Sequence, residues 1–150
     1  MKIEKPILAI DYGKKKIGLA ISDSKGIIAS PLEVLYITQN RNIDTLIDDI
    51  LKIAKEYRIK TILIGSPQIF ESNHEKMSKN IKKFVQKISI LTDLPIITYD
   101  ESYSTTQAQN MLLSLGQNTK SSKGKIDKIA ATVFLQEFLN SKSQGNEVNS

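Results

Sequence analysis

Three short apolar runs open the sequence and alternate with turn-forming residues. Ile7 to Ile10 stops at Asp11, Ile17 to Ile21 stops at Ser22, and a third run extends from Ile27 to Leu35. The turn around Gly26 is the clearest connection between two of them. Short apolar runs joined by tight turns predict three strands in an antiparallel meander.

Helical spacing dominates the following part of the chain. Apolar residues recur at 3.6-residue intervals over residues 41–58 and again over 77–91, which predicts two amphipathic helices. A fourth strand is expected at Thr61 to Gly65 and a fifth at Leu94 to Tyr99. This order predicts a mixed sheet with helices on its faces.

Two further helices are expected near the end of the chain. Ser104 and Gln107 form a capping box that opens a helix running to Leu115. The last helix carries Ile126 to Phe138, after a polar linker at residues 117–125. We expect one domain over residues 1–140 and a frayed tail over 141–150, because 150 residues suit a single core.

Composition excludes several kinds of chemistry. The chain has no cysteine, so it has no disulfide, thiolate zinc site or cysteine nucleophile. Its one histidine, His74, argues against His-rich metal sites and His-based triads. No apolar run approaches the length of a membrane span, and we expect a cytoplasmic protein without a membrane partner.

The charge balance is modestly basic. Lys and Arg total 21 against 16 Asp and Glu, which is compatible with a nucleic-acid partner. Lysines also lie off the apolar stripe of the helix at 77–91 and just before it, namely Lys76, Lys79, Lys83 and Lys87. A solvated helix face is the simpler interpretation of these lysines, and a flank for nucleic acid is the alternative.

Three acidic residues stand at the ends of predicted elements. Asp11 ends the first strand, Glu101 follows the fifth, and Asp127 lies in the first turn of the last helix. If the first, fourth and fifth strands are parallel, their carboxyl ends meet at one sheet edge, where α/β proteins usually bind ligands. The three carboxylates could then converge.

Convergent carboxylates repel one another unless cations neutralise them. Magnesium or manganese suits an all-oxygen ligand set, and two such ions support phosphodiester cleavage. We expect weaker contributions to phosphate binding from Ser104, Lys123 and Lys125.

Each acid also has a purely structural interpretation. Asp11 could be a turn residue ahead of Gly13, while Glu101 and Asp127 could stabilise helix N-termini electrostatically. The tyrosines near the acids, Tyr12, Tyr99 and Tyr103, could stack on bases or pack in the core.

Four segments together resemble the Holliday-junction-resolvase-like family, also called pre-16S rRNA nucleases. Leu8 to Ala20 resembles its opening strand and turn, and Ile64 to Pro67 resembles its Gly-Leu-Pro loop. Tyr99 to Thr105 resembles its Asp-Glu-Arg block, and Lys123 to Ala131 its terminal signature. The segments occur in family order and cover roughly residues 6–140.

The resemblance implies a ribonuclease H-like α/β fold: a five-stranded mixed sheet, first three strands antiparallel, with helices on both faces. It implies that Asp11, Glu101 and Asp127 form a metal-binding catalytic triad for Mg²⁺ or Mn²⁺. The implied activity is trimming of the small-subunit ribosomal RNA precursor in the bacterial cytoplasm. Structured precursor rRNA, in ribosomal precursor particles, is the implied partner. Resolution of branched DNA is the older alternative, inferred from fold similarity.

The sequence departs from the family pattern in three places. Ser102 replaces the arginine of the Asp-Glu-Arg block, which removes a bidentate phosphate ligand. Lys16 stands where arginine is commoner, and residues 68–71 differ from the Asn-Met-Asp-Gly type of loop. These changes concern substrate contacts more than the three acids.

Two rival functions remain open at this stage. A nuclease-like binding module without useful catalysis would account for Ser102 and the altered loop. An actin-like or sugar-kinase ATPase would account for the Asp11-x-Gly13 pattern. Those ATPases bind ATP between two related domains, and this chain is expected to supply only one.

Overall fold

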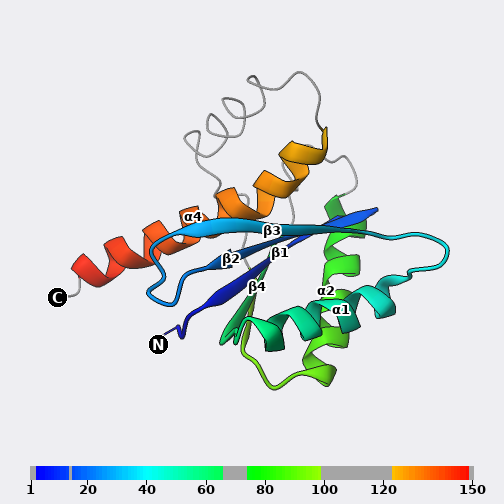
Figure 1. The fold of residues 1–150 in the computed structure, drawn as a ribbon, viewed down its shortest axis with the longest axis horizontal. Coiled ribbons are helices and arrows are strands. Elements are labelled where there is room, and N and C mark those ends of the chain that lie inside the picture. The colour runs from blue at the N-terminus through cyan, green and yellow to red at the C-terminus, as the bar shows by residue number, and fades with distance from the viewer. Residues whose placement is uncertain (1–2, 14, 66–73, 99–122, 149–150) are drawn as a thin grey trace.

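The computed structural model describes residues 3–13, 15–65, 74–98 and 123–148. In the helices, side chains are described for residues 43–56, 79–91 and 130–142. The described residues form five strands and three helices (Figure 1). In chain order these are β1 (Ile7–Tyr12), β2 (Lys16–Ser22), β3 (Ala29–Tyr36), α1 (Ile43–Glu56), β4 (Thr61–Gly65), α2 (His74–Leu91), β5 (Ile96–Thr98) and α4 (Lys123–Val148).

The strands form one mixed sheet in the order β3-β2-β1-β4-β5. β1 pairs antiparallel with β2, and β2 pairs antiparallel with β3. β4 runs parallel to both β1 and β5. The predicted antiparallel meander is therefore confirmed. The first, fourth and fifth strands are parallel, which is the condition for their carboxyl ends to meet. Pro31 lies in the edge strand β3, beside a register shift, where a missing N–H donor is tolerated.

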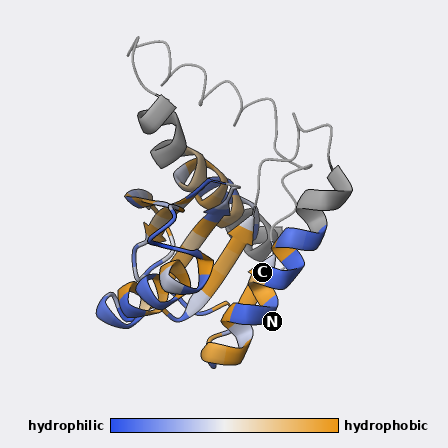
Figure 2. Ribbon diagram, turned by 90° about the vertical axis from the view of Figure 1, so that its right-hand side faces the viewer, coloured by the Kyte–Doolittle hydropathy of each residue, from blue (hydrophilic) through white to orange (hydrophobic). Residues whose placement is uncertain are grey.

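Helices cover both faces of the sheet, as expected. α1 and α2 pack on one face and α4 on the other (Figure 1). Alternate residues of β1 serve the two faces: Leu8 and Ile10 face α1 and α2, whereas Ile7 and Ala9 face α4. All four side chains are fully buried. The buried central strands are therefore almost uniformly hydrophobic, as in Ile7 to Ile10 of β1 and in β4, while the helices alternate between hydrophobic and hydrophilic residues (Figure 2).

Helix α1 shows how the sequence sets an element. The Asn42 side chain caps its start by accepting a hydrogen bond from the Thr45 amide at 3.0 Å. Leu46, Ile47 and Ile50 are fully buried along one face of the helix. Burying each such side chain contributes roughly 1.5–3 kcal/mol, which fixes α1 against the sheet.

Helix α4 corrects two expectations about the end of the chain. It begins at Lys123, so Lys123 and Lys125 belong to a helix and not to a linker loop. Asp127 is consequently its fifth residue, and its placement in the first turn is wrong. Polar first turns escape a search for apolar spacing, because a helix needs an apolar stripe only where it is covered.

Some expectations concern residues beyond this description. The predicted helix opening at Ser104 lies outside the described residues. The backbone of α4 is helical through Val148, and fraying of the tail at residues 141–150 stays a prediction, as does the single domain over 1–140. Across the described part of the chain, no helix is both long and apolar enough to cross a membrane.

Candidate active site

Asp11 lies in the last paired segment of the central strand. It pairs with Gly18 of antiparallel β2 and with Gly65 of parallel β4. The interpretation of Asp11 as a turn residue is therefore wrong, because both neighbouring strands hold its backbone. The tight turn comes later: a Cβ atom on Gly13 would lie 2.8 Å from the Lys16 carbonyl oxygen.

The alternation of β1 determines the face on which Asp11 lies. Ile7 and Ala9 belong to the core cluster beneath α4, so Asp11 follows them on the α4 face. Its side chain is half-buried, and its Oδ1 atom is shielded from solvent. The carboxylate therefore follows the buried residues that β1 presents to α4, at the point where the strand reaches the protein surface.

The cross-strand row of Asp11, meaning the residues paired side by side on β2, β1 and β4, carries a single side chain. In the row before it, Ala9 lies between Ala20 and Leu63, and all three are buried. In the row of Asp11, both neighbours are glycine and carry no side chain. Within β2, β1 and β4, the Asp11 carboxylate is therefore the only side chain of its row.

Helix α4 begins toward the same edge of the sheet. Ala131 is fully buried in the cluster with Ala9, and Asp127 precedes it by four residues, one turn along the same helix face. Further along α4, the Gln136 side chain forms hydrogen bonds with the backbone of Ile27 and Ala29, which lie at the opposite end of the strands. The start of α4 and the tip of β1 accordingly lie at the same end of the molecule (Figure 1).

Tyr12 points to the face opposite Asp11. Its ring packs on Phe84 of α2, with ring centroids 4.8 Å apart. Burial raises the pKa of the Tyr12 hydroxyl above 10.0, and the positive charge of Lys87 partly opposes this shift. Of the two interpretations for Tyr12, packing is the one that the structure confirms.

The structure describes no side chain of the other predicted site residues. Glu101 and Ser104, with Tyr99 and Tyr103, lie outside the described residues, as do the side chains of Asp127, Lys123 and Lys125. β5 ends at Thr98, three residues before Glu101, and runs parallel to β4. In the described ranges no three acidic or histidine side chains form a metal-binding group.

Gly18 and Gly65 are the site features that sequence reasoning missed. Both occur in segments that were assigned to strands, but their relation to Asp11 depends on strand register. Pairing Tyr12 with Ile17 across the first turn would have placed Gly18 opposite Asp11.

This five-stranded mixed sheet with helices on both faces is a ribonuclease H-like fold of the RuvC type. The structure of Thermus thermophilus RuvC in complex with a Holliday junction substrate aligns with a TM-score of 0.62. That alignment covers 91% of this chain and 94% of RuvC at 12% identity, so it supports the fold alone.

Sequence comparison identifies the family within that class. The model of the family described as "RuvX: Holliday junction resolvase" matches residues 5–141, and the chain belongs to this family. A protein of Endomicrobium trichonymphae named "Putative pre-16S rRNA nuclease" is 35% identical over 138 residues, covering 91% of this chain and 96% of its own length. A Rickettsia typhi protein of the same name is 35% identical over 141 residues, covering 94% and 88%.

Proposed function

We propose that this protein is a metal-dependent endonuclease that hydrolyses phosphodiester bonds of structured RNA during maturation of pre-16S rRNA in the cytoplasm. The observation that carries the proposal is the position of Asp11. It lies near the end of the central strand on the α4 face, between two glycines, at the end of the sheet toward which β5 ends and α4 begins. The names of the relatives supply the substrate.

The donor chemistry fits a hard divalent cation. Asp11 offers carboxylate oxygens, which Mg²⁺ and Mn²⁺ prefer, and its two glycine neighbours leave its row without competing side chains. Asp11 would hold the metal together with Glu101 and Asp127. When bound, such ions supply activation of a water molecule and stabilisation of the leaving oxygen.

The remaining roles concern the RNA backbone. Lys123 and Lys125 occupy the first turn of α4, within one turn of Asp127, and we assign them to phosphate contacts. Ser104 is assigned a weaker contact of the same kind. Ser102 supplies no cation, so these lysines take a larger share of phosphate binding than in relatives with arginine there.

The test is cleavage of a labelled pre-16S rRNA fragment and a four-way DNA junction, each with Mn²⁺, Mg²⁺ or EDTA. Asp11→Asn removes the charge at the proposed site, and Asp23→Asn is the matched control, because Asp23 is an exposed acid beyond the end of β2. We expect RNA cleavage that requires metal and falls by about 100-fold or more in Asp11→Asn, since metal catalysis is worth several kcal/mol.

Other outcomes would replace the proposal. Cleavage of the junction with intact RNA would identify a resolvase. Salt-sensitive RNA binding with no cleavage of either substrate would identify a binding module. Wild-type cleavage by Asp11→Asn would remove the mechanism, whichever nucleic acid is cut.

A further inference from the structure

The outer face of α2 carries an uncompensated positive patch. Lys79, Lys82 and Lys83 are exposed, and in the part of the chain that the structure describes they form no ion pair. Lys87, which the sequence groups with them, has a different role: its Nζ bonds Asp44 Oδ1 of α1 at 3.0 Å. We call Lys79, Lys82 and Lys83 the α2 patch.

Helical spacing gathers the α2 patch into one surface. Lys82 and Lys83 follow Lys79 at three and four residues, so the three side chains are neighbours on the helix. Phe84, fully buried, marks the inward side of α2, and the patch therefore faces solvent. Like charges at these spacings destabilise a helix, and an anionic partner would remove that repulsion.

The Tyr12–Phe84 contact ties this patch to the site. Phe84 directly follows Lys83, and its ring lies 4.8 Å from that of Tyr12, the residue after Asp11. Asp11 is on the α4 face and α2 is on the other face of the sheet. The patch and Asp11 consequently flank the end of β1 from opposite sides, separated by the sheet and a helix about 10–12 Å across.

We propose that the α2 patch binds the phosphate backbone of a double-helical part of the RNA substrate while Asp11 lies at the scissile strand. This inference rests on the proposed function. Contacts on both sides of the sheet edge require a ligand that is broad as well as anionic. An A-form duplex meets this requirement, because proteins recognise it through its shape and its phosphates.

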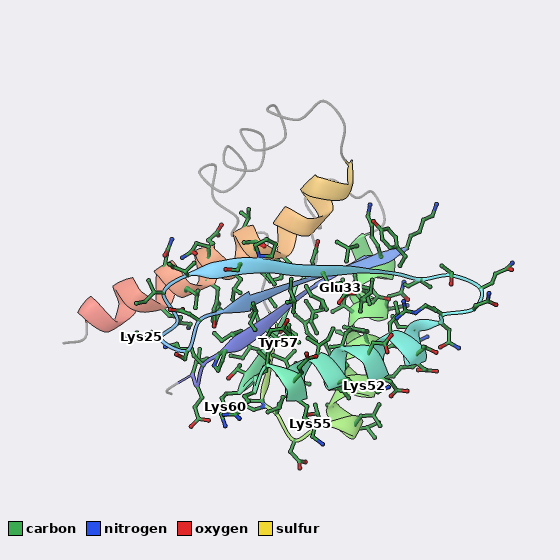
Figure 3. The ribbon with its side chains drawn as sticks, in the orientation of Figure 1. Lys25, Glu33, Lys52, Lys55, Tyr57 and Lys60 are labelled. Atoms are coloured by element: carbon green, nitrogen blue, oxygen red, sulfur yellow. The ribbon has the colours of Figure 1, made fainter. Side chains whose placement is uncertain are left out.

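The chain offers a matched control for the test. Lys52 and Lys55 lie on α1, and Lys60 follows in the loop before β4 (Figure 3). All three are exposed and form no ion pair within the described ranges. Replacing either set by glutamine removes the same charge, and glutamine keeps the helix propensity of lysine.

The experiment compares full-length wild type, the triple variant Lys79→Gln/Lys82→Gln/Lys83→Gln and the control variant Lys52→Gln/Lys55→Gln/Lys60→Gln. Affinity for an RNA hairpin and for an unstructured RNA of equal length is measured in EDTA at several salt concentrations. We expect the α2 variant to bind the hairpin at least 10-fold more weakly at low salt. The slope of log affinity against log salt is negative, and its magnitude should decrease by about 2–3 in this variant, at roughly 0.9 per lost contact.

The control variant should retain the wild-type slope, and the unstructured RNA should show little difference between variants. Equal slopes for the α2 and control variants on the hairpin would refute RNA binding by the α2 patch. Equal losses on hairpin and unstructured RNA would overturn its preference for a duplex. Binding is measured without metal and therefore does not depend on catalysis. A changed slope with no cleavage by wild type would support RNA binding by the α2 patch and refute the nuclease activity.

Discussion

Strand β1 presents different side chains to the two faces of the sheet. On the α1/α2 face, β1 contributes Leu8 and Ile10 and then Tyr12, which packs on Phe84. On the α4 face, it contributes Ile7 and Ala9 and then Asp11, between two glycines. The first face is packed with large apolar groups to its edge, whereas the second ends in a carboxylate.

This difference separates stability from chemistry. The α1/α2 face buries the larger set of apolar side chains, so that face supplies more of the stability. The α4 face is apolar as well and buries Phe134, Leu135 and Phe138, but its strand residues Ala9 and Ala20 supply less area. We therefore expect substitutions on the first face to change mainly stability, and substitutions around Asp11 to change mainly activity.

The largest effect on stability is expected from Ile50→Ala. Ile50 is fully buried in the cluster beneath α1, so its truncation should lower the free energy of unfolding by about 2–5 kcal/mol. Urea denaturation measures this loss, and cleavage per folded molecule should stay at the wild-type level. A loss of cleavage in the folded fraction would show that the two faces are not separate in function.

Gly18→Ala and Gly65→Ala should have the opposite signature. Each adds a methyl group beside Asp11, so metal-dependent cleavage should fall by about 100-fold, as for a displacement of roughly 1 Å. Stability should change little, because alanine is tolerated in strands. Cleavage kinetics and urea denaturation are measured on the same samples. Full activity in both variants would refute the claim that cleavage requires glycine on both sides of Asp11.

A smaller loss of stability is expected when the hydrogen bonds between α4 and the start of β3 are removed. The Gln136 side chain accepts from the Ala29 amide at 2.9 Å and donates to the Ile27 carbonyl at 2.9 Å. Gln136→Leu should cost about 0.5–1.5 kcal/mol, since the part-buried Ala29 amide loses its partner while the exposed Ile27 carbonyl can bond water instead. Faster hydrogen exchange at Ala29 checks this, with exposed Gln86→Leu as the control that leaves exchange unchanged.

The smallest effect concerns Asp23, the acid of the β2–β3 turn. Its Oδ1 accepts from the amides of Ile27 and Ile28 at 2.7 and 3.1 Å. The Ile28 bond first, and then the Ile27 bond, hold the pKa of this carboxyl below 3.8. A lowered pKa stabilises the fold above pH 3.8, and this contribution is lost as pH falls through the folded-state value.

Wild type should therefore be more stable than Asp23→Asn near neutral pH, and the difference should shrink as pH falls below 3.8. Urea midpoints measured across the pH range test this expectation. A constant difference at all pH values would mean that the turn does not depend on the charge of Asp23.

Short-range patterns predict most of the fold, but not every boundary. The third strand begins at Ala29 and not at Ile27, because Asp23 holds the amides of Ile27 and Ile28 in the turn. A single apolar run contains both turn and strand here. Nothing in the apolar pattern distinguishes them, since the deciding contact comes from a polar side chain.

The site is less predictable, because its geometry depends on faces and register. β1 is apolar on both sides from Ile7 to Ile10, so no alternation reveals which face Asp11 shares. The ion pair between Lys87 and Asp44 joins two helices far apart in the sequence and likewise has no local signal. Asp11 itself was predictable, since it interrupts an apolar strand.

The central claim is that Asp11 holds a divalent cation, and Mn²⁺ binding tests it without depending on any substrate. Free Mn²⁺ is followed by electron paramagnetic resonance during titration of wild type, Asp11→Asn and the control Asp23→Asn. We predict that wild type and the control bind Mn²⁺ alike, and that Asp11→Asn binds at least 10-fold more weakly while remaining folded. Wild-type Mn²⁺ affinity in folded Asp11→Asn would contradict the account.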